Sequence, residues 1–188
     1  MASWAPISLP MTSRHLFIVV IALLFVIQAM PAYAFTRSSR YVTLHYSSSE
    51  LLHEFNDELY IGRSLRRMLR KKNLVTVEDE VMAKLDIIIE KAQVVLDMFP
   101  DNMHIHVMLL ADRDAVGRIY EQNYGRSARH IAYYSLKQDT IYISVDDTSL
   151  KVFSHEVGHA VVDHYFKVRP PYNIHELMAQ FTSKHIQD

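Results

Sequence analysis

A mainly apolar segment, residues 150–162, encloses the pentapeptide His155-Glu156-Val157-Gly158-His159. Thr148 or Ser149 offers an N-cap just before it, which predicts that the segment is a helix. Residues four apart lie on one helical face, one turn apart. Both imidazoles can therefore reach a single metal ion. A glycine between them is a poor helix former; its small size would let another element pack closely, or it is incidental.

Glu156 follows the first histidine and lies over the same site, where its carboxylate can hold a water bound to the metal. Two neutral nitrogen ligands, a carboxylate base and an open coordination position are the parts of a zinc hydrolase. The pattern is short and the chain has 11 histidines, so the alternative is a surface helix with two unrelated histidines. The apolar flanks predict a buried helix instead, where a metal-free His-Glu-His cluster would be costly to desolvate. We therefore expect Zn²⁺ at His155 and His159.

A third protein ligand is needed, because catalytic zinc sites usually have three ligands and a water. The extended pattern H-E-x-x-H-x-x-G-x-x-H would supply it on the same helix. That register has Val162 at the glycine position and Tyr165 at the histidine position, so it fails. His164 is one residue off and, at about 100° per residue, points away from the two ligands. We expect His164 to be exposed or structural.

The other source of a third ligand is a carboxylate on a following helix. Pro170-Pro171 blocks continuation of the first helix, and Asn173 is a suitable N-cap for a second. Its expected buried stripe is Leu177, Met178 and Phe181. Glu176 would lie near the start of this helix, beside apolar neighbours. The alternative is an ordinary first-turn glutamate, favoured by the helix dipole.

The motif H-E-V-G-H followed by a glutamate on the next helix resembles the gluzincins, the thermolysin-like clan of zinc metallopeptidases. The resemblance covers residues 130–188 well and the earlier part only by general layout. It implies a zincin-like fold in which His155, His159 and Glu176 bind zinc and Glu156 is the general base for peptide hydrolysis. It also implies that residues 130–135 form the edge strand of a hairpin and pair with an extended peptide or protein substrate.

The residues around the expected third ligand depart from the gluzincin pattern. Gluzincins commonly have asparagine before the ligand glutamate, where this chain has His175. They often have an aspartate one turn later that bonds the first histidine from behind. Gln180 stands there, and its amide oxygen could accept the same bond. Asp163, one turn after His159, is another candidate to support a ligand, or a solvated residue.

A larger departure is the C-terminal subdomain with which bigger relatives close the cleft and supply a histidine or tyrosine to the oxyanion. The sequence offers no counterpart to it. His130, Tyr172 and His175 are the nearest candidates for the oxyanion donor, and the sequence does not choose among them.

The pattern of residues 1–34 is typical of a secretory signal sequence. An uninterrupted apolar run, residues 16–27, follows Arg14 and precedes the small-residue site Ala32-Tyr33-Ala34. We expect cleavage after Ala34 and export to the periplasm or the extracellular space. The alternative is an uncleaved membrane anchor, although the run is short for a spanning helix. The chain has no cysteine, so export requires no oxidative folding and thiolate ligands are excluded.

Residues 35–188 have the length of a single domain with one core. A net charge of −1 gives no basic field for nucleic acid. Periodicity predicts, in order, a strand at 40–46, helices at 50–60 and 76–98, a strand at 103–110, a helix from Asp112 or Asp114 to about 124, strands at 130–135 and 140–145, and the two helices above. This order predicts an α+β domain whose helices pack on a small twisted mixed sheet.

Six basic side chains fall within residues 63–72. This run fits contact with an anionic surface, such as lipid or cell-wall polymer. The alternative, which the sequence alone favours, is a solvated helix face with Leu65, Met68 and Leu69 turned inward.

Taken together, these features predict an exported zinc-dependent peptidase. A rival of another class is a metal-binding or recognition domain of the same fold without catalysis, or one that needs a partner to complete its cleft. A third possibility, a structural domain with chance histidines, predicts no metal. The sequence leaves the substrate preference and the oligomeric state open. It also does not restrict the metal to zinc, since two imidazoles and a carboxylate hold other divalent ions.

Overall fold

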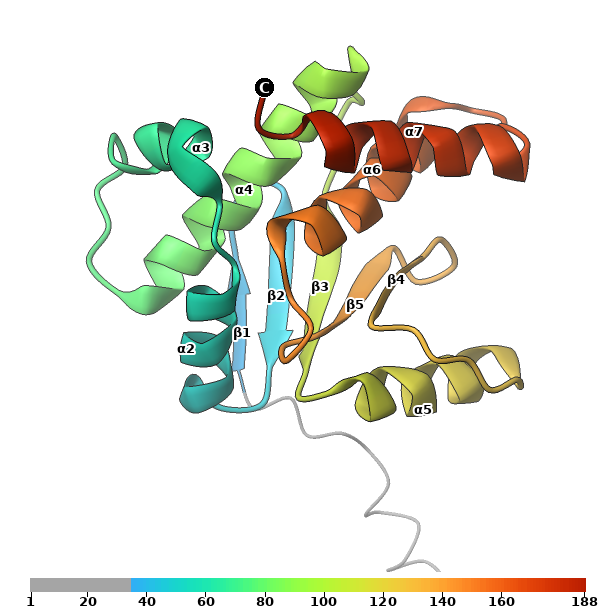
Figure 1. Ribbon diagram of the computed structural model, residues 1–188, viewed down its shortest axis with the longest axis horizontal. Helices are drawn as coiled ribbons and strands as arrows, with labels where there is room; N and C mark the ends of the chain where they lie inside the picture. Colours follow the sequence, from blue (N-terminus) through green and yellow to red (C-terminus); the bar gives the residue numbers. More distant parts are fainter. Residues whose placement is uncertain (1–34) are drawn as a thin grey trace, which may run out of the picture. The chain divides into compact units, whose positions relative to one another are not determined.

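The computed structural model describes residues 35–188, and the predicted signal sequence lies outside the described residues. The described residues form six helices and a five-stranded mixed sheet, which confirms the α+β class (Figure 1). The strands are β1 (Phe35–Ser38), β2 (Val42–Tyr46), β3 (Ile105–Leu110), β4 (Ala132–Ser135) and β5 (Thr140–Ser144). The helices are α2 (Ser49–Glu58), α3 (Gly62–Leu69), α4 (Val77–Leu96), α5 (Arg113–Tyr124), α6 (Leu150–Tyr165) and α7 (Tyr172–His185).

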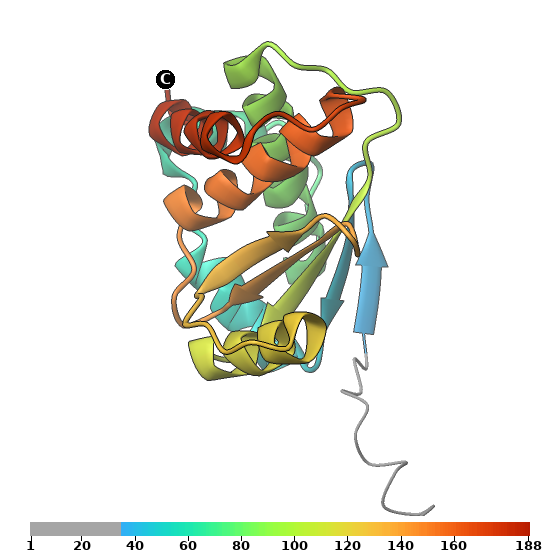
Figure 2. The same ribbon diagram turned by 90° about the vertical axis from the view of Figure 1, so that its right-hand side faces the viewer.

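The sheet has the strand order β1-β2-β3-β5-β4. Strands β2, β3 and β5 are parallel, whereas β1 and β4 are antiparallel to their single neighbours. The expected hairpin is present, and β4 is an edge strand beside α6 (Figure 2). Strand β1 was not predicted, because its four residues are all exposed and carry no apolar alternation.

The main core lies between one face of the sheet and the helices α2, α3, α4 and α6. Alternate residues of β3, namely Ile105, Val107 and Leu109, point into it. Helix α5 covers part of the opposite face through a second, smaller cluster that includes Val116, Tyr120, Tyr133 and Tyr142. Strand β5 is therefore buried on both faces along its whole length.

Side-chain caps place the starts of most helices where the sequence predicts them. Thr76 forms a capping box with Asp79 at the start of α4, and Ser149 rather than Thr148 accepts a hydrogen bond from the backbone N–H of Val152. Asp112 caps α5 in the same way. The predicted cap of α7 at Asn173 is wrong. The helix begins at Tyr172 with Pro171 at the N-cap, where the N–H that proline lacks is not needed.

The buried face of α7 also differs from the prediction. His175, Ala179 and Thr182 face inward, while the side chains of Leu177 and Phe181 are 61% and 47% exposed. Of the predicted stripe, Met178 is partly buried against the main core. The inward residues are small or polar because α7 packs closely on α6, so steric fit rather than hydrophobicity sets the phase of this helix. Among residues 35–188, no helix combines the length and the apolar character needed to cross a membrane.

Candidate metal centre

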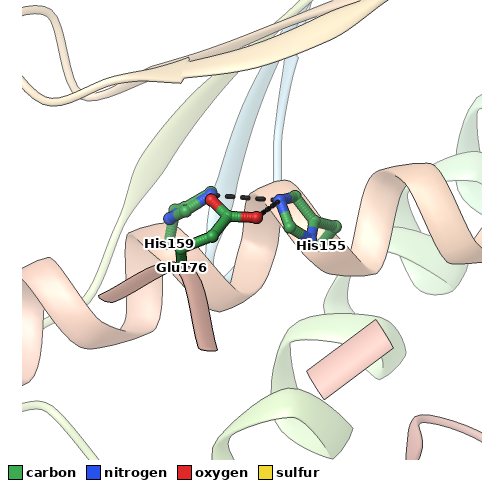
Figure 3. A group of neighbouring side chains, drawn as sticks. All are labelled: His155, His159 and Glu176. Atoms are coloured by element: carbon green, nitrogen blue, oxygen red, sulfur yellow. Dashed lines mark hydrogen bonds and ion pairs between the residues drawn. The ribbon is translucent and has the colours of Figure 1, made fainter. Parts of the chain in front are cut away.

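Helices α6 and α7 bring the three predicted ligands together. His155 and His159 project from one face of α6, and Glu176 comes from the first turns of α7 (Figure 3). The two histidine Nε2 atoms lie 3.2 Å apart. The carboxylate oxygens of Glu176 lie 3.4 Å from each of them, one oxygen toward each ring. No other group of three or more His, Cys, Asp or Glu residues with this closeness occurs in the described part of the chain.

These separations bring the three side chains around one point that a metal ion can occupy. Each histidine Nε2 lies 3.4 Å from a different oxygen of Glu176. One ligand atom from each of the three residues, a set called here the donor triangle, lies within 4.8 Å of the other two. Two imidazoles and one carboxylate are a donor set that zinc accepts. The residues present therefore suit Zn²⁺ in chemistry, and they converge closely enough to share one ion.

The close approach of the two helices depends on Gly158. A Cβ atom at this position would lie 2.8 Å from the Cα of Ala179 and 2.9 Å from the hydroxyl of Thr182. Such distances are too short for non-bonded atoms, so no larger residue fits without moving α7. Gly158 thus sets the distance at which α7 presents Glu176 to the histidines.

Glu156 is buried beneath the edge strand. Its carboxylate accepts a hydrogen bond of 2.8 Å from the backbone N–H of Tyr134 in β4. Burial raises the pKa of Glu156 to about 7, although this hydrogen bond acts in the opposite direction. A carboxylate with a pKa near neutrality is matched to proton transfer, as a general base requires.

His155 and His159 are held neutral by their surroundings. Burial lowers the pKa of His155, and burial together with the neighbouring histidines lowers the pKa of His159 to about 4. Metal ions bind the neutral imidazole. Protons therefore compete weakly for these nitrogens near neutral pH.

A chain of hydrogen bonds supports His159 from behind. Its Nδ1 lies 2.7 Å from Nδ1 of His175, whose Nε2 lies 2.9 Å from Asp163. Arg169 completes the chain with an ion pair of 3.2 Å to the same carboxylate oxygen. If Nε2 of His159 binds metal, its Nδ1–H donates to His175, and His175 donates to Asp163.

The side-chain contacts of α7 correct two predictions. His175 is not an oxyanion donor, because it is 1% exposed and lies behind the ligand rather than in the cleft. Gln180 does not bond His155; it is exposed and donates to Glu176 at 3.1 Å. Asp163 does support a ligand, through His175, and its side chain is only 2% exposed.

His164 has the structural role that its helical phase predicts. Its Nε2 lies 2.9 Å from Asp139 in the turn between β4 and β5, and the same carboxylate oxygen accepts a hydrogen bond from the hydroxyl of Tyr134. Hydrogen bonding to Asp139 raises the pKa of His164. The end of α6 is thereby tied to the hairpin that forms the wall of the cleft.

A cleft of about 680 Å³ opens over the donor triangle. His155, Glu156 and His159 form its floor, and the edge strand forms one wall. His130 and Tyr172 both line it, so both remain candidates for the oxyanion donor. A packed aromatic group extends from the strand: Tyr120 contacts Tyr133 edge-on at 5.1 Å and His130 at 4.6 Å between ring centroids.

Comparison of the chain with protein-family models, with curated proteins and with solved structures returns no match. The function must therefore be argued from the site itself.

Proposed function

We propose that this chain is an exported zinc-dependent peptidase of the gluzincin type, with a zincin-like fold. His155, His159 and Glu176 would hold Zn²⁺, and Glu156 would act as the general base. One observation carries the proposal: two imidazoles and a carboxylate converge beside a buried glutamate that accepts a hydrogen bond from the edge strand.

The chemistry divides between the ion and the chain. Bound zinc polarises a carbonyl oxygen and lowers the pKa of water. Glu156 takes the proton from the attacking water and delivers it to the departing amine. Its hydrogen bond from the backbone of Tyr134 orients the carboxylate toward the cleft. His175 and Asp163 keep the ring of His159 in place during these steps.

Strand β4 supplies the binding edge for an extended peptide. It pairs with β5 on one side only, and it lines the cleft on the other. The backbone N–H of Tyr134 points to that free side, since it reaches Glu156. By the alternation of an antiparallel ladder, the main-chain groups of Ala132 point the same way. A peptide or protein substrate can add to this edge by main-chain hydrogen bonds.

Glu156→Gln tests the proposed chemistry, because glutamine keeps the shape and the acceptor oxygen but cannot take a proton. We expect unchanged metal content and a loss of hydrolysis of an unfolded protein by at least about 100-fold. The matched control is Glu121→Gln, an exposed glutamate of α5. The wild-type activity should also vanish with a chelator and return with zinc. Cleavage by Glu156→Gln at the wild-type rate would show that the mechanism is wrong.

The rival function is a metal-binding domain that needs a partner to complete its cleft. One observation favours it: Ile174, Leu177 and Phe181 form an exposed apolar stripe on the helix that carries Glu176. The two functions separate in the same assay. A zinc-loaded chain that binds metal through the triangle but cleaves no unfolded protein by itself would support the rival.

A further inference from the structure

Helix α3 displays its arginines on one face. They recur with the spacing i, i+3, i+4 and i+7, which places them along a single stripe of a helix. These residues, called here the α3 arginine face, are Arg63, Arg66, Arg67 and Arg70, and all four are exposed. The opposite side of α3 is anchored in the core by Leu65 and Leu69. The helix therefore holds four guanidinium groups toward solvent on a rigid, buried support.

The α3 arginine face has no carboxylate partner among residues 35–188, since none of its side chains forms an ion pair. Glu80 shares a small pocket with Arg66 but pairs with Lys84 at 3.3 Å. No acidic residue occurs between Glu58 and Glu78, and two lysines follow the arginines directly. A chain with a net charge of −1 thus concentrates six positive charges in ten residues.

One side chain with apolar character lies beside the arginines. Tyr60 is 55% exposed, and the guanidinium of Arg66 lies 4.7 Å from the centre of its ring. Tyr60 and the four arginines line a hollow of about 360 Å³. Met68 was expected to face inward and is instead 39% exposed, but at about 100° per residue it projects from another side of α3. Tyrosine is enriched at membrane–water interfaces, where its ring lies at the level of the headgroups.

We propose that the α3 arginine face docks on an anionic phospholipid surface. The planar guanidinium group binds phosphate oxygens bidentately, so the four arginines match a layer of headgroup phosphates. Tyr60 would enter the interfacial layer next to them. The contact is peripheral and needs no spanning helix. It does not involve the metal centre, so failure of the proposed peptidase activity would leave this proposal unaffected, and the reverse also holds.

Vesicle binding by the chain that begins at Phe35 tests the proposal without the apolar N-terminal run. We expect binding to phosphatidylcholine vesicles that contain about one third phosphatidylglycerol, and little binding to pure phosphatidylcholine. A basic residue near an anionic membrane strengthens binding by about fivefold, so Arg63→Gln/Arg66→Gln/Arg67→Gln should weaken it by roughly 100-fold. Glutamine is a good helix former, and unchanged circular dichroism would show that α3 persists.

The matched control removes three exposed charges elsewhere: Arg118→Gln/Lys137→Gln/Lys184→Gln. It should retain most of the binding, which would locate the effect on α3 rather than in net charge. Equal weakening in both triple variants, or no weakening in the α3 variant, would overturn the proposal.

Tyr60→Ser distinguishes a membrane from a soluble polyanion. Serine should weaken binding to the anionic vesicles severalfold and leave binding to soluble polyphosphate unchanged. Binding to polyphosphate or to single-stranded DNA as tight as to the vesicles, with Tyr60→Ser binding vesicles normally, would assign the face to a polyanion and overturn the lipid proposal.

Discussion

His159 is oriented by side chains that lie behind it. The hydrogen bond to His175 selects the tautomer of His159 that leaves Nε2 free toward Glu176. His175 is in turn held by Asp163, which forms an ion pair with Arg169 at the wall of the cleft. The metal-binding geometry therefore depends on His175 and Asp163, two buried residues that would not bind the metal themselves.

His175→Ala removes this support and should weaken zinc binding by about 10- to 100-fold, as measured by competition with a chelator. His175→Asn should recover part of the affinity, because its amide oxygen can accept from His159. His185→Ala on the same helix is the control and should bind zinc normally. Wild-type affinity in His175→Ala would show that the chain of hydrogen bonds has no part in the site.

The pair His164 and Asp139 links stability to pH. The pKa of His164 is raised by its hydrogen bond to Asp139. Protonated His164 therefore adds to the free energy of unfolding in full below about pH 6.5, and this stabilisation is lost as the pH rises through the pKa of the folded state. Burial alone would raise the pKa of Asp139, but hydrogen bonds from His164 and Tyr134 lower it overall. The stabilisation that the ionised carboxylate of Asp139 gives the folded chain is therefore present above about pH 4 and is lost as the pH falls further.

We expect His164→Gln to destabilise the metal-free chain at pH 6 by about 0.5 to 1 kcal/mol, and by much less at pH 8.5. The value is modest because both side chains are partly solvated. Urea denaturation at the two pH values measures the difference, with the exposed His53→Gln as control. An equal loss at both pH values would mean that the charged pair contributes nothing.

The packing of α7 on α6 couples the fold to the site. A Cβ at Gly158 would meet the backbone of α7, so Gly158→Ala should displace that helix and with it Glu176. Alanine normally stabilises a helix interior by about 1 kcal/mol relative to glycine. Here we expect the opposite sign, a loss of roughly 1 to 3 kcal/mol from overpacking, together with weaker zinc binding.

Chemical denaturation and chelator competition on Gly158→Ala measure both effects. Gly117→Ala in α5 is the control and should leave zinc affinity unchanged. A Gly158→Ala chain with increased stability and normal affinity would contradict the role given to this contact.

Elements with strong local signals were predictable, and those set by tertiary packing were not. The sequence of helix α4 predicts a start at Thr76 and a core stripe of Val81, Leu85, Ile88, Ile89, Ala92 and Leu96. The structure has Thr76 as the N-cap, buries the first five of these side chains and leaves Leu96 partly buried against the core. Helix α7 carries an apolar stripe at Leu177 and Phe181 that hydrophobicity assigns to the core, yet its steric fit at Gly158 turns that stripe outward. Strand β1 has no signal of its own, since it pairs with β2 through its backbone.

The same division applies to the site. The spacing of His155 and His159 is local to one helix, so the sequence could place them together. The proximity of Glu176 was implied by the resemblance to gluzincins, whereas the residues alone left an ordinary first-turn glutamate as an alternative. The return of α7 along α6 brings Glu176 to the histidines. The bond from Tyr134 to Glu156 and the position of His175 depend on the register of β4 and the phase of α7. Neither quantity is encoded in a short pattern.

The molecule as a whole places its two candidate functional surfaces on different elements. The metal centre lies between α6, α7 and the edge strand, whereas the α3 arginine face belongs to a helix packed on α4 (Figure 1). Strands β2, β3 and β5 form the rigid centre between the helical layers. The proposed peptidase activity and the proposed membrane contact can therefore be altered separately by mutation.

The metal content of the purified chain, residues 35–188, tests the central claim most directly. It should be measured beside Glu176→Ala and the exposed control Glu121→Ala, with circular dichroism to verify folding. We predict about one zinc ion per chain in the wild type and the control, and much less in Glu176→Ala. Equal zinc content in all three chains would show that Glu176 is not a zinc ligand. A folded wild-type chain that binds no metal would contradict the proposed zinc centre, and the peptidase function with it.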